Sequence, residues 1–206
     1  SNLGNIAYAQ GKYEQAQNFQ EECLALNREV GNKNGMADSL NNLGKTKYTL
    51  GKYEQAREYY EESLTIQNEI GDKSGISHSL NDLGNLFIQL EKFEQAWKYF
   101  EESHALFRSM GEKLGIAISL NNLGKLSLIK GEYKDARKFI EESLGISREI
   151  GDKWGIALTL NGLGNLAYYE RNYESARRYY MESLALKPVS YTHLRAHETV
   201  LDIVCR

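Results

Sequence analysis

The sequence predicts an all-α solenoid of five antiparallel helix pairs, and the first observation behind this prediction is an internal repeat. The stretch Ser39–Gly44 returns as Ser79–Gly84 and again at 119–124 and 159–164, with no insertion between the copies. Its glycine therefore recurs every 40 residues, at positions 4, 44, 84, 124 and 164. Fixed self-similarity at such a period is typical of stacked copies of one supersecondary unit rather than of a globular enzyme core.

The second observation is helical spacing within each unit, which is clearest between residues 32 and 71. From Tyr53 to Ile70, apolar or small residues recur every three or four positions, and charged residues fill the other side. This pattern predicts one amphipathic helix. Ahead of it, Leu40 and Leu43 mark a first helix that ends near Leu50.

The third observation is that 16 of the 18 glycines fall on only four positions of the unit. One of these positions is the turn between the two helices, at Gly51, where glycine reaches the left-handed conformation that a tight helix end needs. Glu91 and Arg171 replace this glycine in the third and fifth units. We therefore expect strained or longer turns at these two residues.

Two further glycine positions flank the break between successive units, as in the stretch 71–75. Asp72 in this break is well suited to cap the next helix by accepting hydrogen bonds from its free N–H groups. The equivalent residues are Asn32, Glu112 and Asp152, of which Glu112 is the poorest cap.

The fourth glycine position lies in the middle of the first helix, where glycine costs roughly 1 kcal/mol relative to alanine. Its return in every unit indicates a packing reason, namely close approach of the partner helix. The sequence suggests a small residue of the second helix as the reciprocal contact, at Ala16, Ala56, Ala96, Ala136 and Ala176.

Composition narrows the classes of function. A formal net charge of -3 gives no electrostatic signature of a partner that is nucleic acid or an anionic membrane. The apolar runs are too short to span a bilayer. Cys23 and Cys205 are too few for a disulfide framework or a zinc site, and no cofactor is predicted. A reducing, cytoplasmic location is the default expectation.

Leu43-Gly44, Ala56, Tyr60 and Ser63 stand at spacings that resemble the tetratricopeptide repeat signature. The proline that commonly closes that repeat is missing, and the second helix continues instead. The sequence is similar to the 40-residue subclass of Pins-type Leu-Gly-Asn repeat adaptors and bacterial signalling proteins, and to kinesin light chains. The resemblance implies a right-handed superhelix whose first helices line a concave groove.

The resemblance covers residues 1 to about 187, so we expect a repeat array over 1–188. Its repeats run approximately over 1–31, 32–71, 72–111, 112–151 and 152–188. Residues 189–206 break the period and resemble the translated read-through of a sequencing-library adapter, so we interpret them as a non-native tail. We interpret the chain as a fragment, and uncapped repeat ends favour self-association.

Several motifs have a structural explanation that outweighs a chemical one. Gly44-Lys45-Thr46 matches the end of a phosphate-binding loop, but the required first glycine is Ser39 and the stretch lies within a helix. His78 and His104 have no convergent partners for metal or acid–base chemistry. Cys23 stands where the other units have serine, as a small packing residue. The repeated Glu-Glu pairs fit a solvated outer face.

The asparagines of the first helices are the candidate site. Residues at i and i+4 share one face of a helix, so each first helix shows a polar strip opposite its leucines. Asparagine both donates and accepts, so a ladder of asparagines can pair with the backbone of an extended peptide. The predicted groove residues are Asn41, Asn42, Lys45, Asn81, Asn85, Asn121, Asn122, Lys125, Asn161 and Asn165. The alternative is that these side chains bond the neighbouring repeat and fix its packing, and both roles can coexist.

These observations favour a non-catalytic scaffold that binds a protein or peptide partner in the groove. The sequence leaves a second interpretation open, in which the repeats are the regulatory or sensor segment of a larger signalling enzyme or transcription regulator. We do not expect the repeats themselves to be an enzyme, because no nucleophile–base pair or ligand cluster appears in the sequence.

Overall fold

The computed structural model describes residues 2–186, and within this range the chain forms ten α-helices. The predicted tail, 189–206, lies outside the described residues. The chain divides into two units, one up to Met110 with α1–α6 and one from Gly111 with α7–α10, which we call unit 1 and unit 2. The helices are α1 Asn2–Ala9, α2 Tyr13–Glu29, α3 Lys33–Thr49, α4 Tyr53–Ile70, α5 Lys73–Gln89, α6 Phe93–Met110, α7 Lys113–Ile129, α8 Tyr133–Glu149, α9 Lys153–Tyr169 and α10 Tyr173–Leu186.

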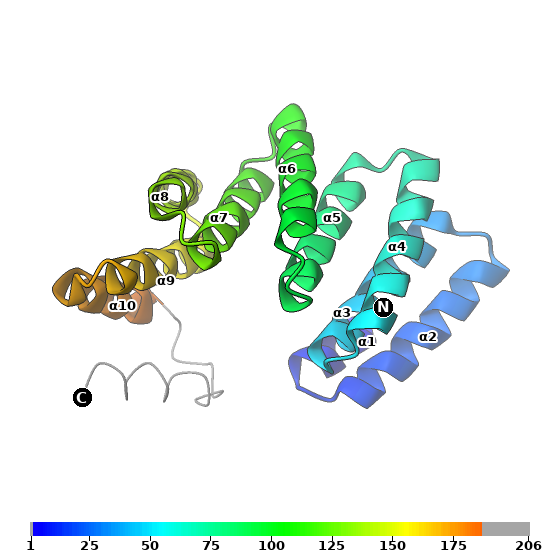
Figure 1. Cartoon of the computed structure of the whole chain (residues 1–206). Helices are drawn as coiled ribbons and strands as arrows, with labels where there is room; N and C mark the ends of the chain where they lie inside the picture. Colours follow the sequence, from blue (N-terminus) through cyan, green and yellow to red (C-terminus); the bar gives the residue numbers. More distant parts are fainter. Residues whose placement is uncertain (1, 187–206) are drawn as a thin grey trace. The chain divides into compact units, whose positions relative to one another are not determined.

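Each 40-residue period supplies two antiparallel helices, so the predicted all-α solenoid is confirmed. Consecutive helices pack side by side within each unit, and in unit 1 α2 and α4 lie in front of α1 and α3 (Figure 1). We call the surface formed by the first helix of each pair the first-helix face. It is made by α1, α3 and α5 in unit 1 and by α7 and α9 in unit 2.

Side-chain caps start the first helices where the sequence predicts them. Asp72 accepts a hydrogen bond from the backbone N–H of Gly75 at 3.0 Å, and Asn32 accepts one from Gly35 at 3.2 Å. Glu112 makes no such bond at the start of α7. The extra methylene of glutamate explains this difference, because its carboxylate is too far from the backbone for the short loop that aspartate closes.

The turns between paired helices confirm the predicted strain. Gly51 has φ 72°, and Glu91 and Arg171 adopt the same left-handed region with φ 57° and 60°. All three turns join helices across three residues, so the turns at Glu91 and Arg171 are strained rather than lengthened. A side chain in this region brings Cβ close to the backbone, which is why glycine is preferred there.

The mid-helix glycines have the expected packing role, but the predicted partner is corrected. A Cβ added to Gly44 would lie 2.5 Å from the ring of Tyr60, and one added to Gly124 would lie 2.5 Å from Cγ1 of Ile140. The nearest group is therefore a large side chain of the second helix, and not the predicted alanine one turn earlier. The alanines are buried beside this contact, because a ring that fills the glycine notch draws the two helices together.

A buried serine of each later second helix ties it to its first helix. The hydroxyl of Ser63 donates to the carbonyl oxygen of Ala37 at 2.8 Å, and Ser143 donates to Ala117 at 2.7 Å. Ser103 and Ser183 make the same bond to Ser77 and Ala157. Cys23 occupies the equivalent position in α2.

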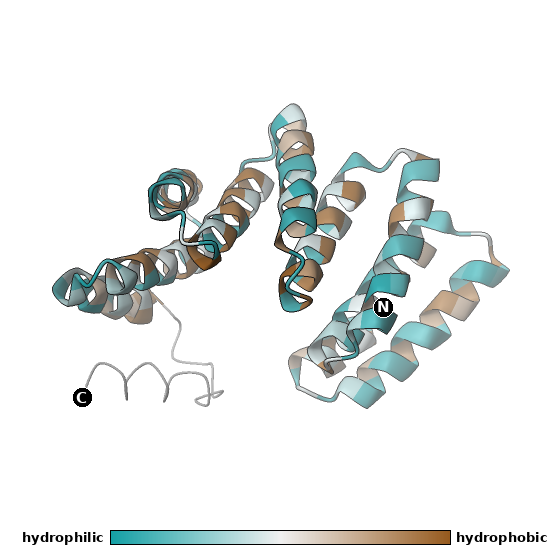
Figure 2. Cartoon of the chain, viewed as in Figure 1, coloured by the Kyte–Doolittle hydropathy of each residue, from teal (hydrophilic) through white to brown (hydrophobic). Residues whose placement is uncertain are grey.

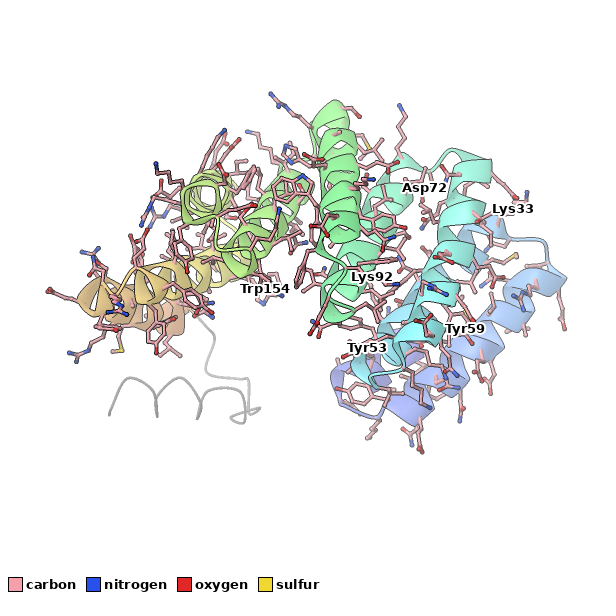
Figure 3. The ribbon with its side chains drawn as sticks, viewed as in Figure 1. Lys33, Tyr53, Tyr59, Asp72, Lys92 and Trp154 are labelled. Atoms are coloured by element: carbon pink, nitrogen blue, oxygen red, sulfur yellow. The ribbon has the colours of Figure 1, made fainter. Side chains whose placement is uncertain are left out.

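Apolar side chains between the helices form the core, and charged ones lie outside. In unit 1 Tyr59 of α4 packs against the cluster that includes Leu24 of α2 and Leu40 of α3, and Figure 3 shows it directed toward α2. Hydrophilic residues predominate along the outward sides of α2 and α4 (Figure 2). Arg28 of α2 pairs there with Glu62 of α4 at 2.8 Å, an exposed ion pair that contributes little to stability.

Candidate functional site

A pocket of about 250 Å³ opens on the first-helix face of unit 1. Four helices contribute to it, α1, α3, α4 and α5, so parts of the first three repeats build its walls. It combines aromatic rings with one pair of opposite charges. Its lining residues are Tyr8, Lys45, Tyr48, Tyr60, Asp82 and Asn85.

The charge pair joins α3 to α5 across the pocket. The ammonium nitrogen of Lys45 lies 3.4 Å from Oδ2 of Asp82, and the side chains are 45% and 22% exposed. Burial raises the pKa of the Asp82 carboxyl, while the positive charge of Lys45 and, more weakly, His78 act in the opposite direction. The pocket thus holds a carboxylate that is only partly compensated by its neighbours.

The aromatic walls are fixed by packing within the repeats. The ring of Tyr60 is held in the notch of Gly44, and burial raises the pKa of its phenol, with a smaller contribution from Asp82. Burial also raises the pKa of Tyr48, whose ring lies 5.7 Å from that of Tyr53. These rings are therefore neutral hydrogen-bonding groups at physiological pH.

In the first asparagine column of unit 1, Asn41 faces the neighbouring repeat and Asn81 is buried. Half-buried Asn41 donates a hydrogen bond to the hydroxyl of Ser79 on α5 at 3.3 Å. Asn81 is buried, with 5% of its surface exposed. Such contacts are of the kind that fixes the packing of successive repeats.

The other predicted residues of unit 1 lie closer to solvent. Lys45 is exposed, while Asn42 and Asn85 are half-buried. Asn85 donates to the backbone carbonyl of Asn81 at 3.0 Å, which leaves its amide oxygen available as an acceptor beside the pocket. The structure therefore brings Lys45 and Asn85 into one pocket and sets Asn41 apart from it.

The predicted residues of unit 2 divide in a similar way. Asn121 and Asn122 are buried, with 8% and 9% of their surface exposed, and Asn161 is half-buried. Lys125 and Asn165 are exposed. The amide oxygen of Asn165 accepts a hydrogen bond from the hydroxyl of Tyr180 at 2.7 Å, so this asparagine also serves its own helix pair.

Neither the aromatic lining of the pocket nor the place of Asp82 in it was predicted from the sequence. The tyrosines follow the same helical spacing as core residues, so their pattern does not distinguish a wall of a pocket from a core position. The sequence does mark Asp82 as different, because the equivalent positions of the second and fourth repeats hold Asn42 and Asn122.

An apolar strip on the first-helix face of unit 2 was also missed. Leu114, Trp154 and Leu158 are exposed, and Trp154 keeps 69% of its surface accessible and projects from the ribbon in Figure 3. Comparison of the same positions in successive repeats could have revealed this strip. The corresponding positions of unit 1 are polar, namely Asn34, Ser74 and His78, whereas those of unit 2 are apolar.

Other types of site find no support within residues 2–186. No group of three or more His, Cys, Asp or Glu side chains in this range converges as metal ligands would. None of the described helices combines the length and the apolar character needed to traverse a bilayer. His78 packs edge-on against the ring of Phe107 at 5.1 Å, which is a structural contact.

Solved structures with the same arrangement of helices are numerous. BtubC (BKLC) from P. vanneervenii is 22% identical with a TM-score of 0.75, over 89% of this chain and 76% of that one. Aspartyl phosphate phosphatase F from Bacillus subtilis is 15% identical with a TM-score of 0.77, over 89% and 48%. A Rap protein complexed with competence and sporulation factor is 12% identical with a TM-score of 0.72, over 89% and 61%. At these identities the likeness concerns the fold alone.

The sequence itself identifies the family. No curated protein matches it. The family profile described as tetratricopeptide repeat matches four overlapping stretches, 1–69, 36–109, 75–149 and 115–188. These matches extend over nearly the whole chain and agree with the helix pairs, the glycine notches and the left-handed turns described above. The chain therefore belongs to the tetratricopeptide repeat family.

Proposed function

We propose that this chain is a non-catalytic protein-interaction module that binds extended segments of a partner along the first-helix face of each unit, taken separately. Tetratricopeptide repeats serve in general as protein-interaction scaffolds, so the family supports this class of function. The observation that carries the proposal is the pocket of unit 1, since it opens where Lys45 and Asn85 present polar groups to solvent. A structural neighbour, a Rap protein complexed with competence and sporulation factor, adds support by analogy.

The chemistry of the face suits a peptide. Exposed or half-buried amides offer both donors and acceptors, so they pair with backbone groups whatever the side chains of the partner. Each such bond contributes roughly 0.5–1.5 kcal/mol net, so four or five of them hold a segment at about micromolar strength. In unit 2 the exposed indole of Trp154 adds an anchor for apolar side chains, which is the type of residue that dominates many interfaces.

The proposal is tested by selecting peptides from a phage-displayed library of random 12-residue sequences on the full-length chain. The expected result is a set of enriched peptides that bind with micromolar Kd in fluorescence anisotropy. If no peptide rises above the background of an unrelated helical protein, the proposed function is wrong.

Variants then separate binding from packing. We expect Asn85→Ala to weaken binding to unit 1 and Lys125→Ala to weaken binding to unit 2, each with little change in melting temperature, because these side chains lie at or near the surface. Asn41→Ala serves as the comparison, since its bond to Ser79 ties two repeats together. A lower melting temperature with unchanged affinity for all three variants would assign the asparagine ladder to structure.

The regulatory interpretation would use the same binding face as a sensor. It differs in requiring an effector domain in the same protein. Resequencing the gene across the codons for Lys187 and beyond distinguishes the two, because a reading frame that enters a domain with recognisable catalytic or DNA-binding motifs favours the sensor. A frame that continues through further 40-residue units favours the scaffold.

A further inference from the structure

The pocket of unit 1 contains a carboxylate that its own protein satisfies poorly. Oδ2 of Asp82 is covered from solvent, and none of the described residues donates a well-aligned hydrogen bond to it. Its contact with Lys45 is 3.4 Å long, whereas charge-assisted N–H···O bonds are about 2.7–2.9 Å. Nearly half of the Lys45 side chain is exposed, so this ammonium can move into water at small cost.

The surroundings of Asp82 are those of a site for a cation. Tyr8, Tyr48 and Tyr60 line the same pocket, and the half-buried rings of Tyr8 and Tyr48 can attract a cation through their negative faces. The half-buried Asn85 offers an amide oxygen beside them. The volume of about 250 Å³ is below the usual range of small-molecule sites, roughly 300–1,000 Å³, and suits one long side chain.

The repeat register shows that the carboxylate is specific to this pocket. The positions equivalent to Asp82 hold Asn42, Asn122 and Gly162, so the fold itself does not require an acid there. Burial of a carboxylate disfavours its charged form, and a bound cation would compensate for that cost.

We propose that this pocket receives an arginine side chain of the bound segment, with the Asp82 carboxylate accepting from the guanidinium and the tyrosine rings flanking it. Lys45 then turns away from Asp82 toward solvent. Arginine fits better than lysine, because its planar fork can donate two hydrogen bonds to one carboxylate while stacking on a ring. This inference rests on the proposed function, since it names the side chain that the first-helix face selects.

The test uses the peptides selected on the full-length chain. We expect them to share an arginine at one fixed position, and replacement of this arginine by alanine to weaken binding ~10-fold or more, as for the loss of a charged hydrogen bond. Asp82→Asn should weaken binding of the parent peptide by a similar factor and leave the alanine peptide unaffected. In a double-mutant cycle the two changes should therefore not add.

The controls separate this inference from the proposed function and from misfolding. Asp135→Asn makes the same chemical change on the exposed surface of α8 and should leave affinity unchanged. Helicity and melting temperature of the Asp82→Asn protein show whether it is folded. Asparagine stands at the equivalent position of three other repeats, as Asn2, Asn42 and Asn122, which indicates that it will be. Selected peptides that lack a common arginine, or that bind wild type and Asp82→Asn equally, overturn the arginine site while the binding function stands. A shared acidic residue whose effect is lost in Lys45→Ala also overturns it. Failure to select any peptide removes both.

Discussion

The ring of Tyr60 lies directly on the backbone of Gly44, so close that a Cβ on this glycine would come within 2.5 Å of ring carbon Cε1 and 2.6 Å of Cδ1. The contact joins the first and second helix of one repeat and recurs at Gly164 with Tyr180. Tyr60 also lines the pocket of unit 1. One glycine thus sets both the spacing of a helix pair and one wall of the candidate site.

The first prediction concerns this glycine. Gly44→Ala should lower the melting temperature by several degrees, although alanine favours a helix by roughly 1 kcal/mol. The reason is that forcing a methyl group against a packed ring costs about 1–3 kcal/mol. Differential scanning calorimetry measures the change.

The matched control is Gly145→Ala in α8, where an added Cβ meets nothing within 4 Å. This substitution should raise the melting temperature, since only the gain in helix propensity remains. Equal effects of the two substitutions would show that the notch at Gly44 is not tightly packed.

The second prediction concerns the strained turns. Glu91→Gly should stabilise unit 1 by up to about 1 kcal/mol, because it removes a side chain from the left-handed region at φ 57°. The reciprocal change Gly51→Ala, at φ 72°, should destabilise it by a similar amount. Urea unfolding of the three proteins checks the sign, and a loss of stability on Glu91→Gly would mean that the longer side chain makes compensating contacts.

The third prediction is a pH dependence from Asp82. Burial raises its folded pKa above the ordinary value of 3.8, so the folded state binds more protons than the unfolded state at pH values just above 3.8. The free energy of unfolding then falls as pH rises through this window. Asp82→Asn removes the effect, so its melting temperature should exceed that of wild type by a margin that grows as pH is raised from about 3 to 7.

Lys45→Met provides the complementary check. The ammonium of Lys45 partly compensates the negative charge of the Asp82 carboxylate. Removing this ammonium should therefore destabilise the protein at neutral pH and have little effect near pH 3, where Asp82 is protonated. A pH-independent difference between wild type and Asp82→Asn would contradict the assignment of the effect to this carboxyl.

The fourth prediction concerns the apolar strip of unit 2. Trp154→Ala should weaken ~10-fold the binding of those selected peptides that bind unit 2, and leave the melting temperature nearly unchanged, because most of the indole is exposed. Met181→Ala on α10 is the control, an exposed apolar residue on a second helix, and should change neither quantity. A large fall in melting temperature for Trp154→Ala would instead mean that the indole supports the fold.

Much of the local structure followed from the sequence because it depends on short stretches of chain. The 40-residue period, the helical spacing from Tyr53 to Ile70, the cap at Asp72 and the strained turn at Glu91 were all predicted and are all present. The helices, the cap and the turn depend on residues a few positions apart, so their backbone preferences and spacing can be read directly from the sequence. The period is visible because the same stretch returns without insertion.

The candidate site was only partly predictable, since it depends on contacts between repeats. The columns of asparagines were visible in the sequence. The sequence did not show that Asn81 is buried, or that Lys45 reaches solvent beside Asp82. Nor could spacing show that Tyr60 rather than Ala56 fills the notch of Gly44. The sequence by itself determined the repeat, its two helices and their family. The packing of α1, α3, α4 and α5 decided which polar groups meet in a pocket, because burial and charge compensation depend on side chains that lie tens of residues apart in the chain.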